Sequence, residues 1–178
     1  MALRTGEEYR ESIRDGRAVW VNGERVKDVT THPMFKPLVD IRARIYDMAH
    51  EQGTADVMSY VDESGDRNNI GYKLPVEQED WHAKWRSIEA VLHEVGGVVT
   101  RVGDETVGEM WSLYDGKDVL DEVDPRFGEN IRRHIDRVLK HDIFHVSANT
   151  DPKGDRSLRP QEQDPDMLLH VVKETDAG

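Results

Sequence analysis

The feature of the sequence that most constrains the fold is a stretch of helical periodicity between residues 77 and 95. Apolar side chains recur there every three or four positions, which is typical of one face of an amphipathic helix. Acidic residues fill the first turn, where the helix dipole favours negative charge, and Gly96-Gly97 ends the pattern. We interpret the two tryptophans as core residues of this helix rather than as a platform for an aromatic ligand. The apolar positions are Trp81, Trp85, Ile88, Val91 and Val95.

Three other segments also predict helices. Helical spacing covers residues 37–51 and, over a shorter stretch, residues 104–114. A third helix is predicted from Asp124-Pro125 to about His141, because Asp is a favourable cap and Pro is tolerated at the first helical position. We expect its buried face to consist of Phe127, Ile131, Ile135, Val138 and Leu139.

Two short hairpins are predicted among these helices. Residues 19–26 have Asn22-Gly23 at their centre, a pair that suits the two positive-φ positions of a type I′ turn. Residues 57–61 and 69–73 form the second predicted hairpin, with a polar turn between them. The sequence therefore predicts a mainly α fold with two small β-hairpins, and a helical domain over residues 1–142.

The character of the chain changes after residue 142. Residues 143–149 and 167–173 have the composition of strands, and a polar loop and a proline-bearing stretch lie between them. Two strands alone are marginally stable in water. We therefore expect residues 143–178 to be the first strands of an incomplete β domain, whose open edges would make the chain aggregate or seek a partner.

Composition excludes several classes of protein. The chain has 24 basic and 36 acidic residues and a net charge of −12, with no basic stripe, so binding to nucleic acid or to an anionic membrane is not expected. It has no cysteine, which excludes disulfides, thiolate nucleophiles and iron–sulfur clusters held by its own residues. No signal peptide or long apolar run is present, so we expect a soluble, cytoplasmic protein.

Chemical motifs are few. The sequence contains no phosphate-binding glycine loop, no nucleophile elbow and no histidine spacing typical of zinc, so no metal site is predicted. Arg101 precedes a predicted helix start, where it could bind an anion or simply pair with Asp104 or Glu105; both readings stay open. The loop 149–157 could be a binding loop, although the residues alone favour an ordinary connection.

The same segments carry a family resemblance. The opening MALRTGEEYRESIRDGRAVWVNGERVKDVTTHPMFKPLVD and the later DPKGDRS resemble the 4-hydroxyphenylacetate 3-hydroxylase family, the oxygenase components of 4-hydroxyphenylacetate 3-monooxygenases. The resemblance runs from about Leu3 to Gly178. It implies an acyl-CoA dehydrogenase-like fold, with an N-terminal helical domain, a middle β domain and a C-terminal helical bundle, commonly in tetramers. Members are much longer than this chain, which leaves three explanations: a truncated chain, a proteolytic fragment, or one subunit of a split enzyme.

The resemblance also implies an activity. Members hydroxylate a phenol ring with FADH2 that a separate flavin reductase delivers; molecular oxygen adds to the flavin to give a C4a-hydroperoxide, which transfers one oxygen to the ring. By this resemblance the chain is the N-terminal part of a two-component FADH2-dependent monooxygenase that acts on a small aromatic or heteroaromatic substrate. We expect it to be inactive by itself. The alternative is a non-catalytic helical subunit that binds a partner chain carrying the rest of the fold.

Site residues follow from the resemblance position by position. Arg101 matches an arginine beside substrate and flavin, and is the expected catalytic residue. Glu105 stands where the family has a tyrosine, and Ser147 where it has a histidine, so both are expected to contact substrate and Ser147 also the cofactor. His145 lies on the same face of the predicted strand as Ser147 and could partly replace that histidine. The residues expected to contact FAD in the loop are Lys153, Gly154, Asp155 and Arg156.

The two departures bear on the substrate. Without the tyrosine and the histidine, groups that would recognise a phenolate are missing, and Glu105 would repel an acidic ligand. We therefore do not expect 4-hydroxyphenylacetate itself as the substrate, and hypothesise a different ring, such as a nitrogen heterocycle.

Overall fold

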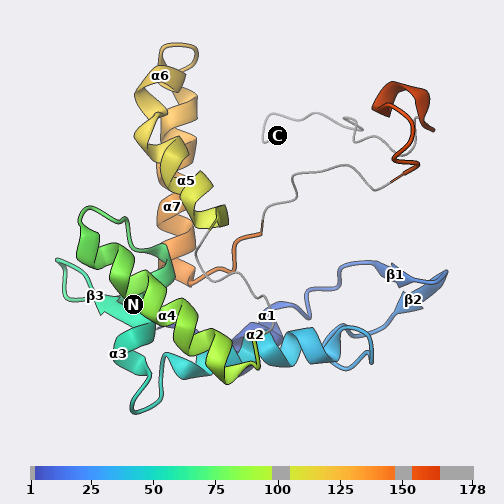
Figure 1. Cartoon of the computed structure of the whole chain (residues 1–178), viewed down its shortest axis with the longest axis horizontal. Helices are drawn as coiled ribbons and strands as arrows, with labels where there is room; N and C mark the ends of the chain where they lie inside the picture. The colour runs from blue at the N-terminus through green and yellow to red at the C-terminus, as the bar shows by residue number, and fades with distance from the viewer. Residues whose placement is uncertain (1–2, 98–104, 147–153, 165–178) are drawn as a thin grey trace. The chain divides into compact units, whose positions relative to one another are not determined.

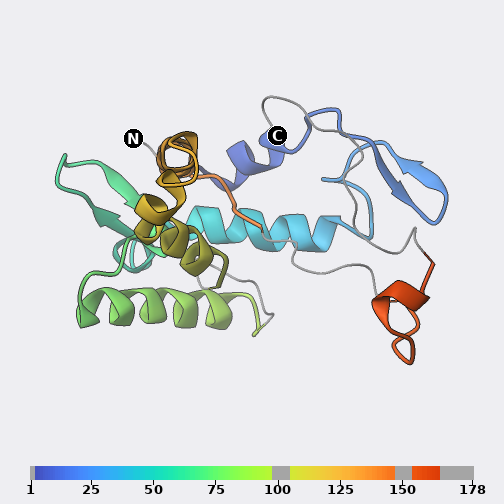
Figure 2. The same ribbon diagram turned by 90° about the horizontal axis from the view of Figure 1, so that it is seen from above.

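The computed structural model describes residues 3–97, 105–146 and 154–164 (Figures 1 and 2). Its contacts divide the chain into two units, Met1–His145 and Val146–Gly178. The first unit is mainly helical, with two antiparallel hairpins, as the sequence predicts. This division lies three residues after the domain boundary expected at residue 142, and the assignment of residues 143–178 to a β domain stays a prediction.

The N-terminal helix α1 (Gly6–Ser12) packs across the long helix α2 (Lys36–Met48). Thr5 and Glu8 form a capping box at the start of α1, a helix that the apolar pattern did not predict. Gly6 lies so close to α2 that its N–H donates to the Asp47 carboxylate at 2.7 Å. The prediction of a helix over 37–51 is confirmed, with an end three residues earlier than expected.

The first hairpin forms as predicted. Strands β1 (Val19–Val21) and β2 (Glu24–Val26) pair antiparallel, and the turn residues Asn22 and Gly23 have φ angles of 51° and 82°. These are the positive values that a type I′ turn requires. In Figures 1 and 2 this hairpin projects from the end of the first unit that holds the start of α2.

The second hairpin is shorter than predicted. Helix α3 (Ala55–Met58) leads into β3 (Ser59–Val61), which pairs with β4 (Arg67–Asn69). The expected strand 69–73 is wrong beyond its first residue, because the Asn69 side chain accepts a hydrogen bond from the Gly71 N–H at 2.9 Å and starts the 3-10 turn η1 (Ile70–Tyr72). A local side-chain cap therefore replaces ladder hydrogen bonds at this point.

Helix α4 (Gln78–Glu94) confirms the predicted helix but not its predicted orientation. Trp81 and Trp85 are 59% and 70% exposed, so their assignment to the core is wrong. Polar residues take the buried face instead, because each has an internal partner: the Asp80 carboxylate accepts from the backbone N–H of Val76 and Glu77, and Lys84 donates to the Gly71 carbonyl. The residues buried on α4 are Asp80, Lys84, Ser87 and Val91.

Three helices complete the first unit: α5 (Glu105–Asp115), α6 (Lys117–Asp121) and α7 (Arg126–His141). The sequence did not predict α6. The Asp124 carboxylate accepts from the Arg126 N–H at 2.9 Å, but α7 begins at Arg126 and its N-cap is Pro125, with no side-chain cap, so the predicted Asp cap and the Pro at the first helical position are wrong by one residue. Phe127 is 42% exposed and is therefore not part of the core.

Two clusters form the hydrophobic core of the first unit. One contains Leu3, Ile45, Met48, Ala49, Met58 and Val91. The other contains Tyr72, Val107, Met110, Ile135 and Val138. The first cluster packs α2 against α4, and the second packs α5 and α7 against η1.

Most of the predicted β domain lies outside the described residues, so this domain stays a prediction. Residues 143–146 belong to no strand, while the rest of the expected strand 143–149 and all of 167–173 lie outside the described residues. The second unit contains the 3-10 turn η2 (Pro160–Glu162). Within the described ranges, no helix has the length and apolar character needed to cross a membrane.

Replacing Gly6 with Ala should destabilise the protein. An added Cβ would lie 2.5 Å from the Ala43 carbonyl oxygen, which belongs to the backbone of α2 and cannot move alone. We expect the free energy of unfolding in urea to fall by about 1–3 kcal/mol.

The matched control is Gly108→Ala. Gly108 lies inside α5, and a Cβ there would meet no heavy atom within 4 Å. Since Ala is a better helix former, this variant should gain about 0.5–1 kcal/mol. Equal effects of the two substitutions would contradict a steric role for Gly6.

Candidate functional site

The segment that leaves α7 carries the described part of the candidate site, and Asp142 fixes its direction. Asp142 adopts the left-handed conformation, with φ 45° and ψ 51°, and is 4% exposed. Its carboxylate accepts from the Arg4 N–H at 3.1 Å and from the Asn69 amide at 3.3 Å, and its carbonyl accepts from the Tyr46 hydroxyl at 2.9 Å. Burial raises the pKa of Asp142, against the opposing effect of these donors.

Tyr72 holds the next three residues in place. Its hydroxyl donates to the Ile143 carbonyl at 2.5 Å and accepts from the His145 N–H at 3.3 Å. The ring is buried in the second core cluster, and this burial raises the pKa of the Tyr72 phenol, so the hydroxyl keeps its proton. The Tyr72 hydroxyl therefore fixes the main chain between α7 and His145. The His145 side chain takes no part in these hydrogen bonds.

The His145 ring has an unused hydrogen-bonding atom. Its Nδ1 is buried and has no hydrogen-bond partner among the described residues. The ring lies 5.3 Å from that of His134 on α7. Burial, with a smaller repulsion from His134, lowers the pKa of His145. A neutral imidazole with one free nitrogen can donate to or accept from a ligand.

A cation and aromatic rings lie beside this segment. The Arg42 guanidinium stacks over the Phe144 ring at 4.0 Å. Tyr9 of α1 and Tyr46 of α2 stack with ring centroids 5.3 Å apart. Burial lowers the pKa of Arg42, but an arginine stays charged at any ordinary pH. The surroundings of residues 143–145 are thus aromatic, with one fixed positive charge.

The second unit contains the described part of the predicted loop. Asp155 accepts from the Ser157 N–H at 2.9 Å and from the Ser157 hydroxyl at 2.6 Å, which closes a tight turn and lowers the pKa of Asp155. Its carboxylate is therefore engaged within the loop. Arg156 is exposed and has no ion-pair partner in the described part of the chain, so its guanidinium is available to a ligand.

The structure locates only some of the expected site residues. Arg101, Ser147 and Lys153 lie outside the described residues. Glu105 is the first residue of α5, but its side chain also lies outside the description. His145 belongs to the first unit, whereas Gly154, Asp155 and Arg156 belong to the second. The expectation that these residues form one site stays a prediction.

Tyr72, Asp142 and Arg42 are absent from the residues that the sequence pointed to. Tyr72 meets its partners across 71 and 73 residues of chain. Asp142 reaches Arg4 across 138 residues. No local spacing relates such positions, so no sequence signal could have identified them.

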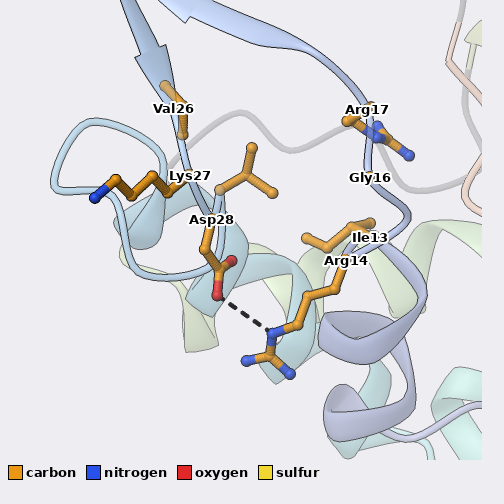
Figure 3. A pocket seen from close by; sticks show the side chains of 8 residues that line it. Ile13, Arg14, Gly16, Arg17, Val26, Lys27 and Asp28 are labelled. Carbon is orange, nitrogen blue, oxygen red and sulfur yellow. Dashed lines mark hydrogen bonds and ion pairs between the residues drawn. The ribbon is translucent and has the colours of Figure 1, made fainter.

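A separate pocket of about 250 Å³ lies between the end of α1 and β2. Figure 3 shows Arg14 reaching Asp28 at its wall. Arg14 also donates to Glu11 and Thr30, so each of its three guanidinium nitrogens has a hydrogen-bond partner. The pocket contains none of the predicted site residues. It is lined by Ile13, Arg14, Gly16, Arg17, Val26, Lys27, Asp28 and Val29.

Comparison with known proteins agrees with this architecture. The family model described as 4-hydroxyphenylacetate 3-hydroxylase N terminal matches residues 5–178. The 4-hydroxyphenylacetate 3-monooxygenase oxygenase component of Thermus thermophilus is 29% identical over 177 residues, which cover 98% of this chain and 36% of the relative. The chain thus spans about a third of the length of the curated relatives it matches.

Two solved structures are similar as well. A crystal structure of the oxygenase component of 4-hydroxyphenylacetate 3-monooxygenase, complexed with FAD and 4-hydroxyphenylacetate, has a TM-score of 0.76 and 28% identity, covering 97% of this chain and 36% of that chain. A 4-hydroxybutyryl-CoA dehydratase from N. maritimus has a TM-score of 0.77 and 27% identity, covering 98% and 35%.

The similarity to these two structures establishes the fold of the chain. The helices and hairpins are those of the N-terminal helical portion of an acyl-CoA dehydrogenase-like fold. The chain belongs to the 4-hydroxyphenylacetate 3-hydroxylase family, of which it matches the N-terminal region.

Replacing Asp142 with Asn should make stability less sensitive to pH. Because burial raises the folded-state pKa of Asp142 above its ordinary value of 3.8, the protonated form stabilises the fold. This contribution is fully present below pH 3.8 and is lost as pH rises through the folded-state pKa. Asn resembles the protonated acid and tolerates the left-handed conformation. The Asn variant should therefore match the parent in acid and equal or exceed it at neutral pH, as measured by urea unfolding from pH 3 to 8.

Asp142→Ala is the matched control. It removes both side-chain hydrogen bonds and should cost about 1–3 kcal/mol at every pH. Parallel curves for the parent and the Asn variant would show that the buried carboxylate does not titrate as inferred.

The His145 ring should titrate below the ordinary histidine value of 6.5. A lowered pKa means that the neutral ring stabilises the fold, so this contribution is present above pH 6.5 and is lost as pH falls through the folded-state pKa. NMR titration of the ring protons measures it. His134→Gln should raise the pKa of His145, because it removes a repulsive neighbour; no change would exclude the coupling between the two rings.

Proposed function

We propose that this chain forms the N-terminal part of a two-component, FADH2-dependent monooxygenase that hydroxylates an aromatic or heteroaromatic substrate. The observation that supports this most is the family match over residues 5–178, which includes every expected site residue. The relative with bound FAD and 4-hydroxyphenylacetate shares this portion at 28% identity. A separate flavin reductase would deliver the reduced cofactor, which supplies the oxygen activation described above for the family.

The described residues fit an aromatic ligand. The free Nδ1 of His145 offers a hydrogen bond next to an aromatic, partly buried surface, which suits a ring hydroxyl or a ring nitrogen. Tyr72 fixes the main chain of His145, so the imidazole is held before a ligand arrives. We propose that His145 binds and orients the substrate ring. It would partly replace the histidine that the family has at the position of Ser147.

The loop residues fit the cofactor. Arg156 has a free guanidinium, and Gly154 lets a ligand approach the main chain closely. Asp155 keeps the loop closed through Ser157 and does not compete for Arg156. We propose that Lys153, Gly154 and Arg156 contact FAD directly and that Asp155 shapes the turn.

Arg101 and Glu105 are the remaining expected site residues. We propose that Arg101 orients the substrate and stabilises negative charge that develops during oxygen transfer. Glu105 would select against acidic rings and in favour of hydrogen-bond donors. The substrate class is therefore a neutral or cationic phenol or a nitrogen heterocycle.

The similarity to a 4-hydroxybutyryl-CoA dehydratase suggests a competing function, that of a dehydratase with an iron–sulfur cluster. Because the 178 residues contain no cysteine, they offer no thiolate ligand to an iron–sulfur cluster. The lack of such ligands in these residues favours the monooxygenase.

The test is an oxygenation assay on the protein expressed from its complete reading frame, beside the 178-residue chain alone. With flavin reductase, FAD, NADH and a panel of phenols and hydroxypyridines, we expect products that gain one oxygen atom, even with catalase present. Stopped flow with reduced FAD should show the transient absorbance of a flavin–oxygen adduct. Arg101→Ala should lower turnover by about 100-fold, the usual effect of losing one positioned donor.

Arg133→Ala is the matched control, because Arg133 is an exposed arginine on α7. It should leave turnover unchanged. Absence of both flavin binding and ring hydroxylation in the complete protein would refute the proposal; unchanged turnover in Arg101→Ala would remove only the role assigned to that residue.

A further inference from the structure

One surface of the first unit is apolar and is left exposed by the described residues. Trp81 and Trp85 of α4 are 59% and 70% exposed, and Glu89 continues the same line one turn later. Glu89 is exposed and has no ion-pair partner among the described residues. We call Trp81, Trp85 and Glu89 the α4 row. Two adjacent exposed tryptophans beside a free charge are typical of a binding surface and atypical of a solvated helix face.

The β1–β2 hairpin presents a complementary surface. Trp20 is 63% exposed, and its cross-strand partner is Arg25, so the two side chains lie on one face of the hairpin. Arg25 and Lys27 have no ion-pair partner within the described ranges. Residues 17–27 hold three basic residues and one acidic residue, in a chain whose net charge is −12. The hairpin is a basic, tryptophan-bearing projection on an acidic protein.

The two surfaces cannot meet within one chain. Figures 1 and 2 both place the hairpin and the start of α4 at opposite ends of the first unit. Helix α2 runs between these two ends and shares a packed core with α4. Contact between the hairpin and the α4 row therefore needs a second molecule.

We propose that the Trp20–Arg25 face of the hairpin docks on the α4 row of a second copy of this chain. Trp20 would pack against Trp81 and Trp85, and Arg25 would pair with Glu89 while stacking on an indole ring. A two-fold axis would make the exchange reciprocal, so that each pair of chains gains two such contacts. A hairpin of two three-residue strands, marginal alone, would gain support from the same contact. This inference does not rest on the proposed function.

Sedimentation equilibrium of the chain, from 1 to 300 μM, is the first test. The parent should form a dimer in this range. Trp20→Ala and Trp85→Ala should each weaken the dimer at least ten-fold, because each removes a central aromatic contact. Both residues are exposed, so the variants should keep the parent's circular dichroism and unfolding midpoint. Val123→Ala is the control, since Val123 is 78% exposed and lies on neither surface.

A charge exchange tests the pairing itself. Arg25→Glu and Glu89→Arg should each weaken the dimer, while the double variant should recover most of the loss because the attraction is restored with opposite signs. Arg25→Glu with Glu129→Arg, at an exposed position on α7, should show no recovery.

The absence of cysteine in the sequence allows a direct test of contact. A mixture of Glu24→Cys and His82→Cys chains, treated with a short bismaleimide, should give a cross-linked heterodimer, and Trp20→Ala in the first chain should abolish it. Three results would each overturn the proposal. The first is a monomer at 300 μM, the second is a dimer weakened by Trp85→Ala but not by Trp20→Ala, and the third is the absence of cross-links in the mixture. The second result would mean that another partner, such as the remainder of a longer polypeptide, covers the α4 row.

Discussion

A buried carboxylate organises the first unit. Asp142 ends α7 in a left-handed turn and at the same point receives the Arg4 N–H from the N-terminus, the Asn69 amide from the second hairpin and, on its carbonyl, the Tyr46 hydroxyl from α2. Four segments distant in sequence thus meet at one residue. An unpaired charge there would be costly, because burial penalises the charged form. The donors offset part of that penalty, and their geometry sets where the chain goes after α7.

Polar burial also decides which way α4 faces. The apolar stripe and the buried face of this helix are neighbours but not the same, because Asp80 and Lys84 find partners in the turn before the helix and in η1. Once those two polar side chains are satisfied internally, they lock the rotation of α4, and the tryptophans turn outward. Hydrophobic area alone would have favoured a rotation of α4 that buries the two tryptophans.

These two cases show what the sequence could predict. Periodicity and turn chemistry found the long helices and the first hairpin, because i, i+4 spacing and the Asn22-Gly23 pair act locally. They failed for the faces of α4 and for the end of β4, where a competing hydrogen bond decides the result. They also failed for Phe127, whose exposure no described contact explains. In the candidate site, His145 and the loop 153–156 came from the family resemblance, whereas Tyr72 and Asp142 act across long sequence separations that no spacing encodes.

The position of the His145 main chain and the charge of the His145 ring depend on different groups. The main chain of residues 143–145 is held by the Tyr72 hydroxyl, and burial raises the pKa of that phenol, so the restraint persists through the pH range in which an imidazole titrates. The ring itself lies next to His134 and keeps a lowered pKa. In the proposed site, protonation of His145 would therefore change the charge next to a ligand without releasing the segment that positions the ring. If His145 binds a ligand as proposed, the site would discriminate ligands by their hydrogen-bonding group and charge, because contacts elsewhere in the fold set the main-chain geometry.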